Sequence, residues 1–380
     1  MARLRRLPLG ALLLALVAVA CTPAPTAGPA GPAGQAAAAL PSSAPAAAGS
    51  SPATAPAARA ARLSPAVSLS MAVTGLTSEA GIYIAYDHGY FREEGLDVDL
   101  VPIRTLAERT AMLATGQVGV GAASIDSSLF NAVLRGIDVK MIAATSTITP
   151  DSTNGAIVVR QDLVEGGRYR EPKDLAGLHV AVAGEGGVIQ FYLERVLNRA
   201  GLNYGDVRTS VILFPEALTA MANKAVDASY EPEPFITYGV AQGIAKPVVY
   251  SGHIYPGGTT GVMLLSPVFA REQPEAARRF VAAWLRGVRD YYRAFQQNAG
   301  DKDAIVQILT QHTDVKDPAL YAKMGLPTLD PNGEIAQWSI DEMQDYFVQA
   351  GSQQQKVDLG QMIDRAYLDY ALQRLGRLAP

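Results

Sequence analysis

Cysteine is nearly absent from this sequence, since Cys21 is the single one in 380 residues. One cysteine excludes an intrachain disulfide, and it leaves the rest of the chain without a thiol nucleophile or a cysteine-based metal site. Histidine is also scarce, and the four histidines are far apart: His88, His179, His253 and His312. Neither a His-x-x-x-His pair nor a Gly-x-Ser-x-Gly turn occurs. We therefore expect no bound metal, no cofactor and no catalytic site, so the chain is not predicted to be an enzyme.

Positive charge is scarce in most of the chain. Five of the 32 basic residues and none of the 36 acidic residues lie in residues 1–66. The rest of the chain therefore has 27 basic and 36 acidic side chains, a net charge of −9. Because binding to a phosphate backbone needs a basic face, this balance argues against nucleic acid as a partner.

The N-terminus has the pattern of a secretory signal peptide. Three arginines precede an apolar run over residues 12–20, and Cys21 ends that run. The run is too short for a spanning helix, which needs about 20 apolar residues. The small residues before Cys21 resemble a bacterial lipobox, although Ala18 stands where that pattern usually has leucine. We predict a signal peptide in 1–20 and a lipid on Cys21 that anchors an extracytoplasmic protein to the membrane. The alternative is an ordinary cleaved signal followed by a chance cysteine.

A low-complexity segment follows the cysteine. Residues 22–62 are almost wholly Ala, Pro, Gly, Ser and Thr, with no aromatic residue and no charge before Arg59. Such a segment has too little apolar surface to offset the entropy of ordering it, and its prolines keep it semi-extended. We predict a disordered linker over residues 21–66 between the membrane anchor and a folded domain.

From Val67 onward, strand-like apolar runs alternate with amphipathic helical segments. This alternation predicts an α/β fold with largely parallel sheets covered on both faces. The pattern restarts near residue 156 and gives way to helices after residue 266, which predicts two lobes. We place the first lobe in 67–155, the second in 156–261, and a return to the first with C-terminal helices in 262–380. The strands Ala156–Arg160 and Val262–Ser266 are expected to cross between the lobes, with a ligand in the cleft between them.

Four stretches carry a resemblance to a known family. They are AGIYIA with GYFREEGL in 80–96, GQVGVGAAS in 116–124, DLAG before HVAVA in 174–183, and VDA with EPEPF in 226–235. In this order and spacing they resemble the nitrate/sulfonate/thiamine-precursor group of ABC-importer substrate-binding proteins. Gly119 departs from the pattern, because many members have aspartate there.

The resemblance implies a bilobed periplasmic-binding-protein type II fold and a small-molecule solute held by hinge closure, with no catalytic step. It also implies a monomer whose closed form docks on ABC permease and ATPase subunits. One alternative is a lipoprotein that senses a ligand without a transporter. A related branch contains pyrimidine-synthase enzymes, which are cytosolic and carry a cysteine-rich iron-binding segment. The export signal and the lack of cysteines beyond Cys21 argue against that reading.

Polar strand ends and glycine-rich helix starts are the candidates for solute contact, because ligands of such sheets lie at the carboxyl ends of the strands. The candidates are Thr74, Gly75, Thr77, Ser78, Ser124, Thr145, Glu185, Gly186, Gly187, Tyr230, Glu231 and Thr259. The glycine-rich loop lacks the Lys-Ser/Thr of a P-loop, so it does not predict nucleotide hydrolysis. Glycine-rich helix starts favour a sulfonate or carboxylate, whereas Glu231 and the hydroxyls favour a nitrogen heterocycle. The predicted ligand is therefore a small organic solute.

Overall fold

The computed structural model describes residues 61–379. The predicted signal peptide, Cys21 and residues 22–60 of the expected linker lie outside the described residues. Within residues 61–379, no helix is both long enough and apolar enough to cross a membrane.

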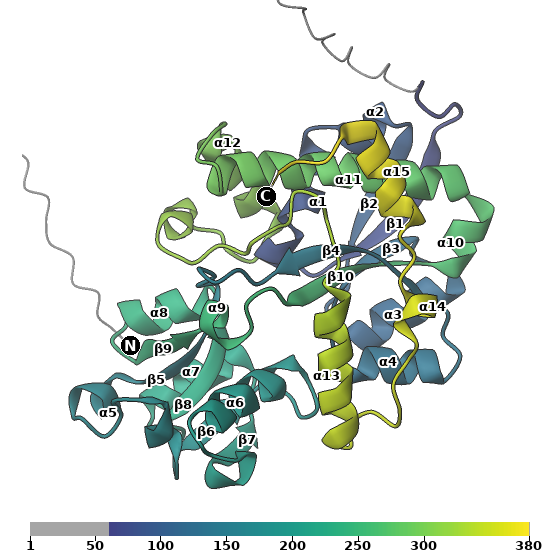
Figure 1. The fold of residues 1–380 in the computed structure, drawn as a ribbon. Coiled ribbons are helices and arrows are strands. Elements are labelled where there is room, and N and C mark those ends of the chain that lie inside the picture. Colours follow the sequence, from purple (N-terminus) through teal and green to yellow (C-terminus); the bar gives the residue numbers. More distant parts are fainter. Residues whose placement is uncertain (1–60, 380) are drawn as a thin grey trace, which may run out of the picture. The chain divides into compact units, whose positions relative to one another are not determined.

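The first of two sheets has the strand order β2-β1-β3-β10-β4 (Figure 1). Its strands are β1 Val67–Val73, β2 Leu96–Pro102, β3 Val120–Ser124, β4 Lys140–Thr147 and β10 Thr259–Leu265. Strand β1 runs parallel to β2 and β3, whereas β10 runs antiparallel to both of its neighbours. The sheet is therefore mixed, and a strand from late in the chain lies between two early ones.

The second sheet repeats this plan with the order β7-β6-β8-β5-β9. Its strands are β5 Gly155–Arg160, β6 His179–Val182, β7 Arg208–Val211, β8 Ala228–Pro232 and β9 Ala245–Tyr250. Strand β6 is parallel to β7 and β8, and β5 is antiparallel to β8 and β9. The predicted α/β class with two lobes is confirmed, but the sheets are mixed rather than largely parallel.

The reversed strands have a topological cause. The chain leaves the first sheet at the carboxyl end of β4, crosses through residues 148–154, and enters the second sheet as β5. The return crossing follows α9 (Ser251–Ile254) through residues 255–258 and enters the first sheet as β10. Each of these strands starts at the edge where the parallel strands end, so it must run opposite to them. The two segments that were expected to cross between the lobes therefore belong to the interior strands β5 and β10. The actual crossings are the segments directly before these strands. The boundary expected after residue 261 falls inside β10.

Helices cover both faces of the first sheet. One face carries α1 (Ala80–Asp87), α2 (Tyr90–Glu93), α11 (Pro274–Phe295), α12 (Lys302–His312) and α15 (Ala366–Leu375). The other carries α3 (Leu106–Thr115) and α4 (Ser127–Leu134), and α10 (Pro267–Glu272) leads into α11. Helix α11 is 22 residues long. Its fully buried Phe280, Trp284, Val288 and Tyr291 recur every three or four residues, so they form one apolar stripe against the sheet and α1.

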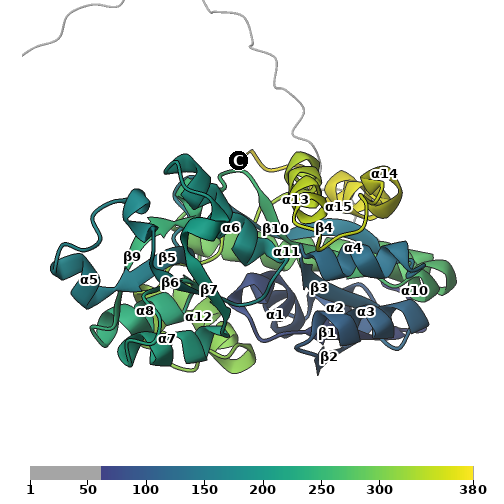
Figure 2. The same ribbon diagram turned by 90° about the horizontal axis from the view of Figure 1, so that it is seen from below.

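The second sheet is covered in the same way. Helix α6 (Val188–Arg199) lies on one face, and α7 (Phe214–Ala222) and α8 (Phe235–Ala241) lie on the other, as Figure 2 shows. The short α5 (Gln161–Glu165) follows β5. Because each face buries its own apolar cluster, the side chains of a second-sheet strand alternate between the two clusters.

The C-terminal region contacts both lobes. Helix α13 (Gln337–Gln349) packs on α6 and on β10, and it precedes α14 (Leu359–Met362). The Tyr255 hydroxyl donates to Glu342 Oε2 at 2.9 Å, and Glu342 also pairs with Arg195 of α6. Upstream of α13, the Gly325 amide donates to Glu233 Oε1 at 3.0 Å. The helical tail therefore adds polar connections between the lobes.

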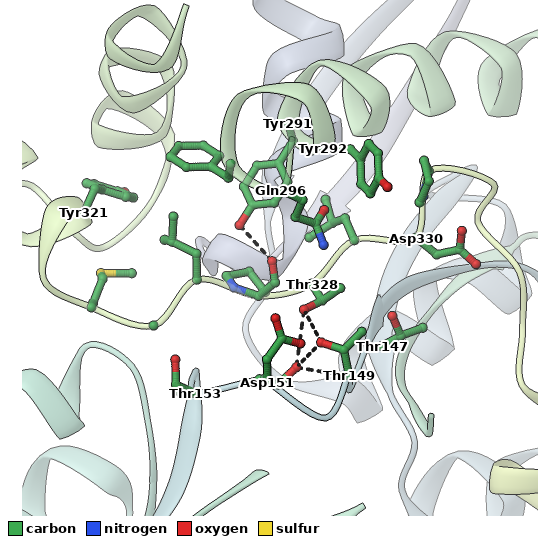
Figure 3. A pocket seen from close by; sticks show the side chains of 18 of the residues that line it. Thr147, Thr149, Asp151, Thr153, Tyr291, Tyr292, Gln296, Tyr321, Thr328 and Asp330 are labelled. Carbon is green, nitrogen blue, oxygen red and sulfur yellow. Dashed lines mark hydrogen bonds between the residues drawn. The ribbon is translucent and has the colours of Figure 1, made fainter. Parts of the chain in front are cut away.

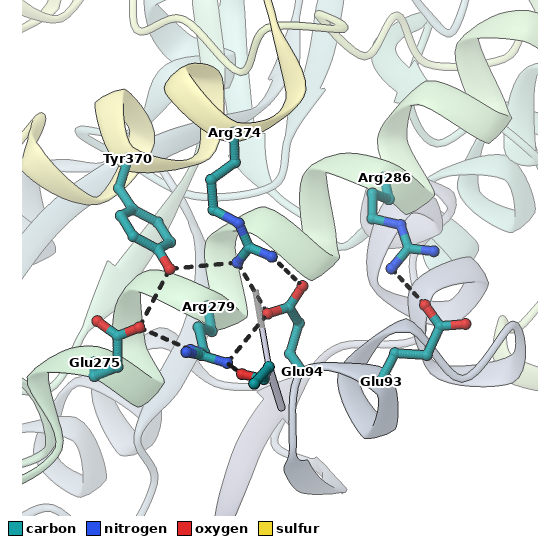
Figure 4. Close-up of polar contacts among 8 residues, drawn as sticks. Glu93, Glu94, Glu275, Arg279, Arg286, Tyr370 and Arg374 are labelled. Carbon is teal, nitrogen blue, oxygen red and sulfur yellow. Dashed lines mark hydrogen bonds and ion pairs between the residues drawn. The ribbon is translucent and has the colours of Figure 1, made fainter. Parts of the chain in front are cut away.

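A buried ion-pair network holds the start and the end of the described chain against α11 (Figure 4). Arg374 of α15 donates to both carboxylate oxygens of Glu94 at 2.9 Å, and the Glu94 side chain is only 6% exposed. Arg279 of α11 donates to Glu275 at 2.7 Å and to the Ala61 carbonyl at 2.5 Å. Removing one partner of such a pair is costly, because the other partner remains as an unpaired buried charge.

Candidate functional site

The predicted residues of the first lobe gather at the carboxyl edge of its sheet, but they differ in environment. Ser124 ends β3, lies opposite Gly261 of β10 and is exposed. Thr259 is opposite Thr147 and fully buried. Its hydroxyl accepts from the Ala336 amide at 2.9 Å, and its own amide donates to the Ser339 hydroxyl at 3.0 Å. These bonds give Thr259 a structural role in holding the start of α13. Thr145 is also buried, with 5% of its surface exposed.

The loop after β1 is organised by a residue that the sequence analysis did not single out, Glu79. Its Oε2 accepts from the Thr74 amide at 2.8 Å, the Gly75 amide at 3.2 Å and the Tyr83 hydroxyl at 2.7 Å. Gly75 has φ of 83°, which a glycine adopts without strain. Glu79 is 3% exposed, and the helix that follows begins without a side-chain cap. Thr77 and Ser78 belong to the 3-10 turn that connects this loop to α1, and neither side chain caps α1.

The polar start of α4 in the first lobe contacts the glycine-rich start of α6 in the second lobe. Asp126 and Gly187 form an isolated antiparallel bridge. Asp126 also caps α4 by accepting from the Ser128 amide at 2.8 Å. The Gly186 amide, which was predicted to face the solute, donates to Gln190 Oε1 at 2.7 Å. A Cβ at Gly186 would overlap the Ser352 side chain, and a Cβ at Gly187 would lie 3.0 Å from Asp126 Oδ2. Both glycines therefore allow close packing between segments that are distant in the chain. Of this loop's predicted residues, Glu185 is the exposed one.

The two predicted residues of β8 point to opposite faces of the second sheet. Tyr230 is 8% exposed and packs against Tyr192 of α6, with the ring centroids 5.5 Å apart. Glu231 is fully buried on the other face, and neither of its carboxyl oxygens has a hydrogen-bond partner. Burial raises its pKa to about 8, and the Ser229 hydroxyl, which donates to the Tyr230 carbonyl at 3.3 Å, acts in the opposite direction. Such a group is exceptional, because buried polar atoms are nearly always hydrogen-bonded.

Small residues flank Glu231 on the neighbouring strands. Ala156 of β5 is its register partner, and Ala181 of β6 lies opposite the preceding Ser229. Tyr250 of β9 pairs with Ala156, so its ring lies on the same side of the sheet one strand further. Short side chains and an aromatic ring therefore lie nearest to the buried carboxyl on its face of the sheet.

A large cavity lies beside the lobe crossings, and none of the predicted residues lines it (Figure 3). Its volume is about 1370 Å³, and its walls come from the first crossing, α11, α12 and residues 318–336. A row of hydroxyls lies at its floor: Thr149 is 3.0 Å from Ser152 and 3.2 Å from Thr328. The Tyr291 hydroxyl donates to the Pro327 carbonyl at 2.8 Å on the opposite wall. No local sequence pattern could have revealed this cavity, because its lining is assembled from distant segments.

Among residues 61–379, no group of three or more His, Cys, Asp or Glu side chains is placed to hold a metal ion. The side chains of His88, His179 and His312 instead make contacts within the fold. His312, for example, lies 2.9 Å from Asp87 and stacks on Tyr83 with ring centroids 5.1 Å apart.

Two lobes, each a five-stranded mixed sheet entered by one reversed strand, define the bilobed class of periplasmic binding proteins. The chain belongs to the NMT1/THI5-like family, whose model matches residues 77–297. The family resemblance inferred from the sequence motifs is thereby confirmed.

One relative and several solved structures show what the chain is similar to. The riboflavin-binding protein RibY of Chloroflexus aurantiacus is 27% identical over 294 residues, covering 76% of this chain and 75% of that protein. The periplasmic aliphatic sulphonate-binding protein SsuA of Escherichia coli superposes with a TM-score of 0.63 at 18% identity, covering 79% of this chain and 92% of SsuA. The nitrate-binding protein NrtA of Synechocystis gives a TM-score of 0.63 at 14% identity, covering 82% and 89%. At these identities the structures establish the predicted fold.

Proposed function

We propose that this chain is the extracytoplasmic solute-binding component of an ABC importer, and that it holds a small organic solute between its lobes without transforming it. Family membership and the two-lobed fold support this reading. So do the names of the similar proteins, which are binding proteins for riboflavin, sulfonates and nitrate. ABC permease and ATPase subunits would be the partners of the closed form, and the protein would act as a monomer anchored through Cys21.

The observation that carries the proposal is Glu231. A buried carboxyl without a partner costs free energy in the empty protein, and a solute that supplies the missing hydrogen bonds recovers it. With its pKa near 8, the carboxyl is mainly protonated at neutral pH and offers one donor and one acceptor. The N–H and ring-nitrogen or carbonyl edge of a nitrogen heterocycle matches that pair. An inorganic anion does not match it.

Among the predicted solutes, we therefore favour a nitrogen heterocycle over a sulfonate or a carboxylate. Ser124 and Glu185, the exposed predicted residues, are retained as contacts at the edges of the two sheets. The hydroxyl-lined cavity beside the crossings is the second place where a solute fits, because it is large enough for a drug-sized ligand.

A thermal-shift screen of the purified full chain tests the proposal. The panel contains riboflavin, an aminopyrimidine, taurine, an alkanesulfonate, a dicarboxylate and nitrate, and each hit is followed by titration calorimetry. We expect saturable binding of a heterocycle and at least a tenfold loss of affinity in Glu231→Leu, because leucine has neither a donor nor an acceptor. If no solute in the panel raises the melting temperature at millimolar concentration, the binding function is refuted.

A further inference from the structure

The cavity beside the lobe crossings has an apolar wall that the fold leaves partly uncovered (Figure 3). Phe295 of α11, Val306 of α12 and Leu326 line this wall, and each side chain is only half-buried in the protein. The Tyr291 hydroxyl on the same wall is already bound to the Pro327 carbonyl, at 2.8 Å. An organic molecule that covered this wall would remove apolar surface from water, which favours binding.

The wall opposite is polar and belongs to the first crossing. The Thr149 hydroxyl lies 3.0 Å from that of Ser152 and 3.2 Å from that of Thr328, and the last two are 3.3 Å apart. A hydroxyl group has more acceptor lone pairs than these contacts use. The cluster can therefore accept a further hydrogen bond from a molecule that lies in the cavity.

The charges of the lining favour a neutral or cationic occupant. The described lining residues that carry a charge are Asp151, Asp303, Asp330, Glu334 and Lys302. Glu334 is paired with two arginines that do not line the cavity, and the three aspartates outnumber the lysine. An anionic group in the cavity is therefore repelled by like charge.

The cavity also lies where a ligand can act on the hinge. Thr328 forms a backbone bridge with Thr147 at the end of β4, and a Cβ on Gly325 would overlap the backbone of Thr153 in the crossing. The Gly325 amide donates to Glu233 Oε1 in the second lobe at 3.0 Å. Residues 325–328 are thus tied to the crossing and to the second lobe, whereas α11 and α12 pack in the first lobe. A molecule that touches both walls contacts parts whose relative position depends on the hinge.

We propose that this cavity is a second ligand site for a neutral or cationic amphipathic molecule other than the transported solute, and that its occupant stabilises the closed lobes. In this structure the lobes touch where Asp126 bridges Gly187, so the arrangement that the occupant favours is a closed one. None of the residues predicted to contact the solute lines the cavity. The two ligands would therefore be coupled through lobe closure, each raising the affinity of the other. The coupling rests on the proposed function, whereas the site itself does not.

Fluorescence titration of the full chain with two matched dyes tests the ligand class. N-phenyl-1-naphthylamine is neutral, and 8-anilino-1-naphthalenesulfonate has the same aromatic body with an added sulfonate. We expect saturable binding of the neutral dye, at least about fivefold tighter than that of the anionic dye. Replacing Asp151 and Asp303 together by asparagine should narrow this difference, because both acids are exposed at the cavity. Equal affinities of the parent for the two dyes would overturn the assigned ligand class.

Blocking variants test whether the dye lies in the cavity. Val306→Trp fills the cavity from α12, and Gln296→Trp fills it from the exposed end of α11, where a larger side chain does not disturb the core. Each should weaken the neutral dye at least about tenfold. Gln311→Trp and Gln297→Trp are the matched controls, because these exposed positions lie nearby in the chain and do not line the cavity. If the neutral dye does not bind, or if both blocking variants bind it as tightly as the parent does, the site is refuted.

A competition experiment separates this site from that of the solute. The neutral dye is titrated with and without a saturating amount of the best solute from the thermal-shift panel. We expect the solute to increase the dye's affinity, and the dye to increase the solute's affinity by the same factor. Competitive displacement would show that the cavity is the solute's own site, which overturns the second site while the binding function stands. Unchanged affinities would refute the coupling. If no solute binds while the blocking variants still lose the dye, the proposed function and the coupling fall and the cavity site stands.

Discussion

Replacing Glu231 by glutamine should stabilise the solute-free protein, and the gain should grow with pH. The side chain is fully buried without a hydrogen-bond partner, and burial raises its pKa from 4.5 to about 8. The folded state therefore holds a proton that the unfolded chain releases between these two pH values. Since the folded-state pKa is the higher one, this group's stability is fully present below pH 4.5 and is lost as the pH rises through 8.

The size of the effect follows from the two pKa values. One unit of pKa difference corresponds to about 1.4 kcal/mol, so ionisation linkage at Glu231 costs the folded state about 3 kcal/mol at pH 7 and about 5 kcal/mol at pH 9. Glutamine has nearly the same shape and carries no charge at any of these pH values. The variant should therefore match the parent near pH 4.5 and exceed it by those amounts at pH 7 and pH 9.

Urea unfolding followed by circular dichroism at pH 5, 7 and 9 measures the difference. Glu185→Gln is the matched control, because Glu185 lies in the same lobe and is exposed. Its stability should follow that of the parent at all three pH values. A Glu231→Gln variant whose advantage is the same at pH 5 and pH 9, or one that is less stable at pH 9, would show that the carboxyl has a partner in solution.

Three further outcomes are expected. Glu94→Gln should lower the free energy of unfolding by about 2–3 kcal/mol in urea titrations, because Arg374 loses its charged partner. A change below about 0.5 kcal/mol would contradict a stabilising role of this ion pair. Gly186→Ala should lower the melting temperature markedly more than Gly177→Ala. Both glycines have positive φ, at 68° and 75°, but a Cβ has open space only at Gly177; equal losses would show that backbone strain alone matters. Cys21→Ser should move the protein from the membrane fraction to the soluble extracytoplasmic fraction, as judged by fractionation and immunoblotting; unchanged membrane association would refute the lipid anchor.

The α/β class, the lobes and the helical tail were predictable because apolar periodicity is a local signal. The 22-residue helix α11 shows this well, since its proline start and regular apolar stripe fix both its bounds and its buried face. Strand direction was not predictable in this way. Whether β5 and β10 run with or against their neighbours depends on the edge at which the chain enters each sheet, and no property of six or seven residues encodes that.

The predicted solute contacts stay predictions. Strand-end reasoning selected Glu231, whose carboxyl oxygens are buried, and Gly186, which packs against Ser352. It passed over Glu79, whose importance comes from backbone amides several residues before it. A polar residue at a strand end has the same sequence signature whether it faces a solute or another loop. Only the partners of its atoms separate the two cases.

The reversed strand β10 also constrains the order in which the lobes are completed. All strands of the second sheet lie within one continuous stretch of chain, from β5 to β9, so that lobe has its whole sheet once β9 is available. The first sheet is different, because Ser124 of β3 pairs with Gly261, which is translated only after the entire second lobe. During synthesis the first-sheet strands therefore keep an unpaired edge while the inserted lobe folds, and in this interval the chain is most exposed to aggregation.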